Sequence, residues 1–172
     1  MLRTSRLLLR PHLVTDLERY ALLMGTDESQ YDPGAMPPLS VEEAWARLLR
    51  FVGHWSHFGY GLFIVEDCLT GELIGEVGYA HFQRGVHADF DTALEGAWRV
   101  ALSRRRQGIA LEALQTALAW IDQTVHAERT VCMIHPTNGA SLKVAARLGY
   151  REFTRTRYKN GTVALFERLA PR

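Results

Sequence analysis

The chain has 172 residues, of which 47% are hydrophobic and 23% charged, close to the averages of globular proteins. This length suits one compact domain, and no repeat, low-complexity tract or linker divides the sequence, so we expect a single domain over residues 1–172. The 20 basic and 19 acidic side chains nearly cancel, which argues against nucleic acid or an anionic membrane surface as a partner.

The N-terminal segment and the cysteines indicate a cytoplasmic protein. The leucine run Leu7 to Leu9 is too short for a signal peptide or a membrane span, and it predicts a first strand. Cys68 and Cys132 are far apart in the sequence and fit neither a metal-binding pattern nor a disulfide framework. We interpret both as packing residues and expect no metal site.

Two helices are predicted after the first strand. Thr15 and Glu18 have the spacing of a capping box, which would open a helix ending near Met24. A long loop over 25–39 follows, and it either shapes a substrate mouth or simply connects the elements.

The second capping box, Ser40 with Glu43, would start a helix whose apolar residues recur at helical spacing until Gly59. Residues 62–65 and 73–82 then predict an antiparallel hairpin, and 83–91 a polar loop.

The second half alternates strands and helices. A strand over 94–102 leads through an arginine-rich turn into a helix with an apolar stripe from Leu111 to Ile121. The remaining predicted elements are a strand at 130–134, a helix at 138–148 and a closing hairpin formed by 150–157 and 162–168 around Asn160-Gly161. The order predicts a mixed α/β sheet.

The turn before the long helix, Arg105-Arg106-Gln107-Gly108-Ile109-Ala110, is the most specific feature. A helix begins there directly after a glycine, and helix N-termini present unpaired N–H groups that suit a pyrophosphate. Arginine side chains at Arg104 to Arg106 can meet further phosphates. A solvated basic loop is the alternative interpretation.

A second helix start supports the phosphate interpretation. Asn138 and Ser141 are three residues apart and lie on one face of its first turn, although Asn138 also suits a helix cap. This helix ends at Leu148-Gly149-Tyr150.

Together, these segments resemble the GNAT family of N-acetyltransferases, whose coenzyme A motif, Arg/Gln-x-x-Gly-x-Gly/Ala, is matched by Arg105, Gly108 and Ala110. The segments 4–11 and 73–78, with Asn138-x-x-Ser141, look like the branch that acetylates ribosomal-protein N-termini. The resemblance covers nearly the whole chain. It implies a GNAT-like, largely antiparallel central sheet flanked by about four helices.

The resemblance also implies acetyl-CoA as cosubstrate and places it residue by residue. The pantetheine arm would pair with the backbone of the strand before the turn, and a free N–H near Val100 would polarise the thioester carbonyl. Asn138 would hydrogen-bond the pantetheine. The implied cofactor-binding residues are Trp98, Val100, Leu102, Arg105, Arg106, Gln107, Gly108, Ile109, Ala110, Asn138 and Ser141.

Aminolysis of a thioester needs a neutral amine, so a general base is useful. Glu76 is the first candidate because it sits mid-strand among apolar residues and glycines, and Glu95 on the adjoining strand is the second. Many family members place a proton-donating tyrosine seven residues after the asparagine, where this chain has Ala145. Ser141 is therefore the candidate acid. Alternatively, Glu76 and Glu95 are ordinary strand carboxylates that pair with a nearby arginine, and Ser141 only contacts the cofactor or caps the helix.

We therefore expect direct transfer of an acetyl group, within a ternary complex, to a protein N-terminal α-amine or a small-molecule amine. The alternative is a sensor or interaction module that binds coenzyme A or acyl-coenzyme A without turnover, which the missing tyrosine allows. Asp27, Glu28 and Asp32 form one candidate acidic rim for a cationic acceptor, with a solvated loop as the duller interpretation. A homodimer is compatible with the resemblance.

Overall fold

A single eight-stranded sheet organises the chain, for which the computed structural model describes residues 1–27, 36–159 and 161–171. The strand order is β1-β2-β3-β4-β5-β6-β8-β7, and every neighbouring pair is antiparallel except β5 and β6. The strands are β1 (Leu2–Arg3), β2 (Leu7–Arg10), β3 (Leu62–Asp67), β4 (Leu73–Ala80), β5 (Leu94–Val100), β6 (Arg129–Ile134), β7 (Arg151–Tyr158) and β8 (Gly161–Leu169). This arrangement confirms the predicted mixed, largely antiparallel sheet.

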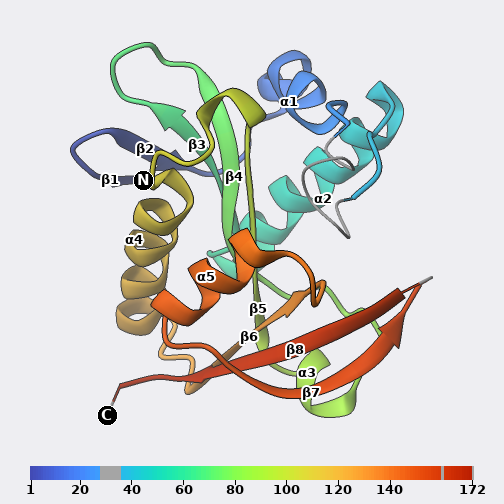
Figure 1. Ribbon diagram of the computed structural model, residues 1–172. Coiled ribbons are helices and arrows are strands. Elements are labelled where there is room, and N and C mark those ends of the chain that lie inside the picture. Colours follow the sequence, from blue (N-terminus) through green and yellow to red (C-terminus); the bar gives the residue numbers. More distant parts are fainter. Residues whose placement is uncertain (28–35, 160, 172) are drawn as a thin grey trace.

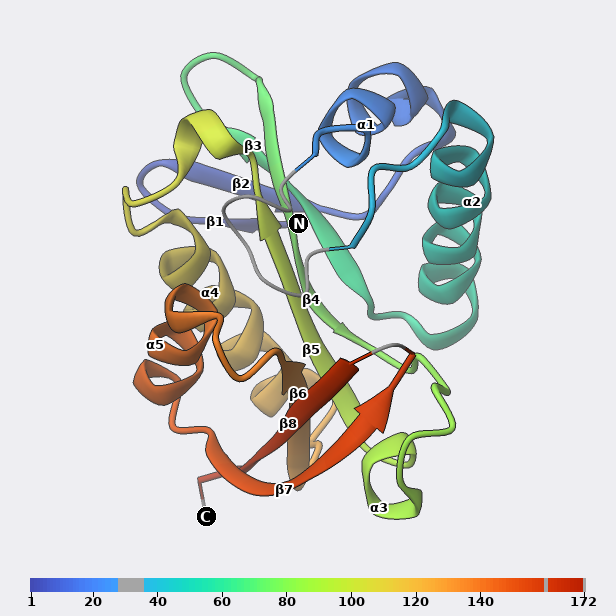
Figure 2. The same ribbon diagram turned by 45° about the vertical axis from the view of Figure 1, so that its right-hand side comes forward.

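Helices cover both faces of this sheet. The described residues form five α-helices, namely α1 (Leu17–Met24), α2 (Val41–Phe58), α3 (Ala88–Asp91), α4 (Ile109–Thr124) and α5 (Gly139–Arg147), and two short 3-10 turns at Val14–Asp16 and Leu102–Arg104. Figures 1 and 2 show α4 and α5 on one side of β4 and β5, with α1 and α2 on the other. None of the helices in the described ranges is long and apolar enough to cross a bilayer.

The alternation of side chains along the strands divides the core between these two layers. Phe63 and Val65 of β3 join the apolar face of α4, whose stripe includes Leu114 and Ile121 as expected. Ile64, between them in sequence, instead packs against α1 and α2. The sheet is therefore buried on both faces, which holds the strands of the site in fixed positions.

Some predicted boundaries are correct and others are not. The Ser40–Glu43 capping box is confirmed, with Glu43 N–H donating to Ser40 Oγ at 3.2 Å, and Gly59 ends α2 with a φ of 74°. The Thr15–Glu18 box is wrong, because Asp16 takes the N-cap position of α1. Its carboxylate is buried and bonded to Arg10 instead of capping the helix.

Two further expectations differ from the structure. The predicted first strand is a hairpin of β1 and β2, in which Leu7 N–H donates to Thr4 Oγ1 at 2.9 Å. The polar loop at 83–91 contains the short helix α3, and Asp91 accepts backbone hydrogen bonds from four residues of this loop: Arg84, Gly85, Val86 and His87. The predicted hairpin at the C-terminus is confirmed by the pairing of Tyr158 with Gly161, while Asn160 lies outside the described residues.

Gly78 on β4 gives a test of how tightly β3 and β4 pack. A Cβ there would lie 2.6 Å from the Gly61 carbonyl oxygen, and its φ of 146° is unfavourable for other residues. We expect Gly78→Ala to lower the free energy of unfolding by about 2 kcal/mol or more. Gly53→Ala, in the middle of α2 with open space around it, should instead raise it by up to about 1 kcal/mol. Urea unfolding measures the free energy of unfolding of both variants. Equal changes in the two variants would contradict the packing argument.

Candidate active site

The site lies where β5 leaves the sheet. β5 pairs with β4 from Glu95 to Val100, but with β6 only at Leu94 and Glu95 within the described chain. Because Ala101 N–H donates to the Ile74 carbonyl at 2.9 Å, strand alternation turns the backbone groups of Trp98 and Val100 away from β4. These groups therefore face the side on which β6 has diverged.

A cavity of about 880 Å³ opens along this free edge. On one wall are Trp98 and Val100 of β5, and on the other is the first half of α5. Ten of the eleven predicted cofactor-binding residues line it, namely Trp98, Val100, Leu102, Arg105, Arg106, Gly108, Ile109, Ala110, Asn138 and Ser141. Gln107 is not among the described lining residues. Its side chain donates to the Ser103 carbonyl at 3.3 Å instead.

The N-terminus of α4 forms the end of this cavity. Arg106 and Gly108 both adopt left-handed conformations, with φ of 61° and 77°, and Gly108 is the N-cap. The first hydrogen bond of the helix runs from Glu112 N–H to the Gly108 carbonyl at 3.0 Å. Residues 109–111 therefore have N–H groups with no partner inside the helix, and these residues line the cavity. This geometry suits an anion such as a pyrophosphate.

Basic side chains surround this end of the cavity. Lys143 and Arg147, one turn apart on α5, stand among the lining residues and were missed by the sequence analysis, although their i, i+4 spacing is visible in the sequence. Arg104, which we expected to meet phosphates, also lines this cavity and pairs with Asp67 and with Glu72, the latter at 3.5 Å.

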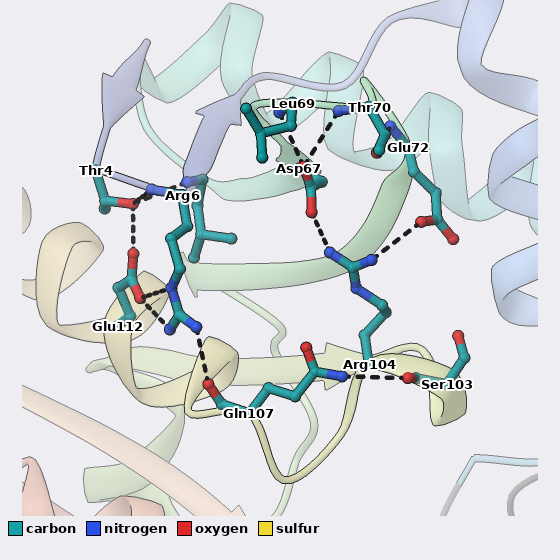
Figure 3. A network of polar contacts seen from close by, with 11 residues as sticks. Thr4, Arg6, Asp67, Leu69, Thr70, Glu72, Ser103, Arg104, Gln107 and Glu112 are labelled. Atoms are coloured by element: carbon teal, nitrogen blue, oxygen red, sulfur yellow. Dashed lines mark hydrogen bonds and ion pairs between the residues drawn. The ribbon is translucent and has the colours of Figure 1, made fainter.

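Ion pairs connect both sides of the turn before α4 to the rest of the sheet, as Figure 3 shows. Arg104 reaches the β3–β4 turn. Arg6 pairs with Glu112 of α4 through Nε at 2.9 Å and donates to the Gln107 carbonyl at 3.2 Å. Thr4 Oγ1 also donates to Glu112. The N-terminal hairpin thus positions the turn from outside the cavity.

A second cavity, of about 650 Å³, lies on the α1–α2 side. Its described lining includes both predicted bases, Glu76 and Glu95, and residues of α2, β5, β6 and the β7–β8 hairpin. Trp98, Arg99, Asn138 and Ser141 line both cavities. The two cavities therefore meet beside β5, and a group in one can reach a group in the other.

Glu76 is buried, and three side chains hold its carboxylate. His12 Nε2 and Tyr20 Oη donate to Oε1 at 2.8 and 2.6 Å, and Arg47 pairs with Oε2. Burial by itself would raise the pKa of Glu76, but the charge of Arg47 and the hydrogen bond from His12 outweigh it and lower the pKa to about 2. This carboxylate stays ionised at neutral pH and is a weak base.

Glu95 has a different environment. It is also buried, and Arg84 Nε donates to its two oxygens at 2.9 and 2.7 Å. Burial raises the pKa of Glu95, and the hydrogen bond and charge of Arg84 only partly oppose this. A carboxylate with a raised pKa is the stronger proton acceptor.

The hydroxyl of Ser141 lies at the junction of the cavities. Trp98 Nε1 donates to Ser141 Oγ at 3.2 Å, and Asn138 Oδ1 accepts from Ser141 N–H at 3.0 Å. Asn138 therefore caps α5, as its alternative interpretation held. Ala145, which occupies the position of the usual tyrosine, is fully buried. The nearby Tyr150 donates a hydrogen bond to Thr130 at 2.8 Å.

The expected acidic rim has little support in the described chain. Asp27 is exposed and lines neither cavity, and Glu28 and Asp32 lie outside the described residues. The side chains that do line the second cavity include arginines that the sequence analysis did not single out, namely Arg47, Arg50, Arg84 and Arg99. They were missed because they lie on three segments that are far apart in the sequence: α2, the 83–91 segment and β5.

The acetyltransferase (GNAT) domain family matches residues 6–151. The chain belongs to the GNAT acetyltransferase family. A solved structure from Bordetella pertussis, assigned to the same family, is 32% identical, with a TM-score of 0.87 and coverage of 97% of this chain and 98% of that one. An acetyltransferase from Agrobacterium tumefaciens is 25% identical, with a TM-score of 0.79 and coverage of 97% and 92%.

Two other similar proteins are covered only in part or share little sequence with this GNAT protein, so their functions do not transfer to it. The uncharacterised protein YkkB of Bacillus subtilis is 29% identical over 111 residues, which span 64% of this chain and 62% of that protein. Ribosomal-protein-S5-alanine acetyltransferase of Vibrio fischeri has a TM-score of 0.79 and 21% identity, with coverage of 98% and 95%. At that identity, the likeness shows a shared fold. Members of the family use acetyl-CoA and act on amine acceptors.

The bonds around Glu76 predict how the free energy of unfolding depends on pH. The pKa of Glu76 in the folded protein is about 2, below its ordinary value of about 4.3 in the unfolded chain. The ionised carboxylate therefore stabilises the fold fully above a pH of about 4.3, and this stabilisation is lost as the pH falls toward 2. Glu76→Gln leaves Arg47 without its buried partner, and we expect a loss of about 3 kcal/mol at pH 7.

Urea unfolding at pH 7, 5 and 3 measures this effect. The difference between wild type and Glu76→Gln should shrink as the pH falls, while the exposed control Glu128→Gln should follow the wild type. A difference that stays constant with pH would show that the carboxylate charge is not responsible.

Proposed function

We propose that this GNAT protein transfers an acetyl group from acetyl-CoA directly to a primary amine, either a protein N-terminal α-amine or a small-molecule amine. The observation that carries the proposal is the meeting of the two cavities at Trp98, Arg99, Asn138 and Ser141. The first would hold the cofactor along β5, and the second would hold the acceptor. Both substrates could then be bound together, as direct transfer requires.

The free edge of β5 supports this placement of acetyl-CoA. Its pantetheine amides would pair with the backbone groups of Trp98 and Val100, and its pyrophosphate would lie at the N-terminus of α4. The N–H of Val100 would then donate to the thioester oxygen and stabilise the negative charge that develops there during attack.

Each transfer forms one C–N bond and breaks one C–S bond. The acceptor arrives largely as an ammonium ion, so a base must remove a proton before nitrogen can attack the thioester carbon. The tetrahedral intermediate then expels the thiolate of coenzyme A, which takes up a proton. The net products are an amide, free coenzyme A and one proton.

Glu95 is the better supported of the two candidate bases. Both carboxylates line the acceptor cavity, but the pKa of Glu95 is raised by burial, whereas that of Glu76 is about 2. Within the described residues, Glu76 accepts bonds from three side chains, His12, Tyr20 and Arg47, whereas Glu95 accepts bonds from Arg84 alone. We infer that Glu95 takes the proton, directly or through a water, and that Glu76 positions Arg47.

Ser141 is the proposed donor to the departing thiolate. Its oxygen accepts from Trp98 Nε1, which leaves the hydroxyl proton free to point toward the junction of the cavities. The absence of a side-chain hydroxyl at Ala145 supports this assignment.

Gly108 tests the cofactor site. Gly108→Glu would bring a carboxylate beside the pyrophosphate and force a side chain into a left-handed conformation. We expect the affinity for acetyl-CoA, measured by calorimetric titration, to fall at least about 100-fold. Gly53→Glu, on the exposed side of α2 and outside both cavities, should bind normally. Equal affinities for the two variants would refute the phosphate site.

Glu95 is tested by turnover, measured as release of the coenzyme A thiol with a panel of peptides and small amines. Glu95→Gln should lower kcat/KM by about 100-fold or more, with acetyl-CoA affinity unchanged. It should also abolish the decline in rate as the pH falls through the raised pKa of Glu95, since a protonated carboxyl cannot accept the proton.

Glu76→Gln in the same assay should keep that pH dependence. Full activity of Glu95→Gln would contradict our assignment of the base. Tight acetyl-CoA binding with no turnover across the panel would favour the sensor instead.

A further inference from the structure

The charge of the acceptor cavity indicates which amines it receives. Among the described residues that line it, five are basic and two are acidic. The basic ones are Arg47, Arg50, Arg84, Arg99 and Lys159, and the acidic ones are Glu76 and Glu95. A cavity with this surplus of positive charge repels polyamines and attracts anionic groups.

Both carboxylates already have arginine partners. Arg47 pairs with Glu76 and donates through Nε to Tyr20 at 2.9 Å. Arg84 binds Glu95 through two nitrogens and donates through Nη1 to the Tyr158 hydroxyl at 3.1 Å. Within the described residues, each carboxylate thus forms its direct ion pair with an arginine other than Arg50.

Arg50 is that further cation. It lies one turn after Arg47 on α2, and its guanidinium sits over the rings of Phe51 and Phe82, at 4.9 and 5.5 Å from their centroids. Within residues 1–27, 36–159 and 161–171 it makes no hydrogen bond or ion pair. The Arg50 side chain is exposed at the cavity. Partial burial and the positive charges of Arg47 and Arg84 lower its pKa, and the charge of Glu76 opposes this effect.

Phe82 brings Arg50 and Arg84 together. The Arg84 guanidinium lies 4.5 Å from the centroid of the same ring, so two cations share one aromatic side chain. The hydroxyl of Tyr158, which accepts from Arg84, has its own proton left to donate. An oxyanion placed here would find a guanidinium with unused donors and a hydroxyl donor, and it would relieve the repulsion between like charges.

We propose that the acceptor carries, apart from its amine, a carboxylate or phosphonate that binds Arg50. This inference rests on the proposed function, since it takes the second cavity as the acceptor site. Arg50 is then a specificity-determining residue, and the acceptor spans the cavity from Arg50 to the junction at Ser141.

Matched pairs of amines test the inference. β-Alanine and 4-aminobutyrate are each compared with their amides, and 2-aminoethylphosphonate is compared with ethanolamine. We expect kcat/KM to be about tenfold or more higher for the anionic member of at least one pair, with the carboxylate and phosphonate pairs telling the two anions apart. In Arg50→Gln this preference should fall to about one.

Two control variants separate charge from folding. Arg50→Lys keeps the positive charge and should keep part of the preference, and Arg3→Gln, on exposed β1 and outside both cavities, should keep all of it. No preference for anionic acceptors in the wild type, or a preference that survives Arg50→Gln, would overturn the inference.

Binding without turnover keeps the inference testable if no amine is acetylated. N-acetyl-4-aminobutyrate and its amide are titrated into the protein saturated with coenzyme A. Tighter binding of the acid that is lost in Arg50→Gln would support the anion site even though acetyl transfer had failed. Equal or absent binding of both compounds, without turnover, would overturn it. Turnover without any preference would leave the proposed function standing and remove the anion site.

Discussion

The site depends on how β5 is paired. On one edge this strand is bonded to β4 along its length, and on the other it leaves β6 after Glu95. A buried strand with an unpaired edge is unfavourable unless other groups satisfy its N–H and C=O groups. Arg105 Nε satisfies one of them, the Val100 carbonyl, at 3.2 Å. The others face the cavity that we assign to acetyl-CoA, so an incomplete sheet becomes a binding surface.

Ion pairs between distant segments hold this opening in shape. Arg6 pairs with Glu112 and so connects the N-terminal hairpin to α4, and Arg104 connects the turn before α4 to the β3–β4 turn (Figure 3). On the opposite face, Glu76 joins α1 and α2 to β4 through buried partners. Buried charges of this kind are costly when unpaired, which fixes the relative positions of the elements. In the second cavity, Arg47 and Arg84 are consequently held by Glu76 and Glu95.

Much of the fold and of the cofactor site could be predicted from the sequence because the signals are local. Helical periodicity gave α4, and the Ser40–Glu43 spacing gave the start of α2. A glycine between basic residues and a helix marked the turn before α4. Local signals failed where a distant partner competed for a side chain. The expected Thr15–Glu18 capping box does not form, because Asp16 takes the N-cap position of α1 while Arg10 binds its carboxylate.

The sequence by itself determined the family, the order of elements and most of the residues along the cofactor cavity, since these follow from spacing within short segments. The tertiary structure gave the two candidate bases different environments. Glu76 and Glu95 look alike in sequence, yet His12, Tyr20 and Arg47 lower the pKa of the first and burial raises that of the second. It also decided the charge of the acceptor cavity, because Arg47, Arg50 and Arg84 come together only when α2 and the 83–91 segment pack beside the sheet. Burial and the meeting of distant charges are properties of the folded chain, and no local pattern encodes them.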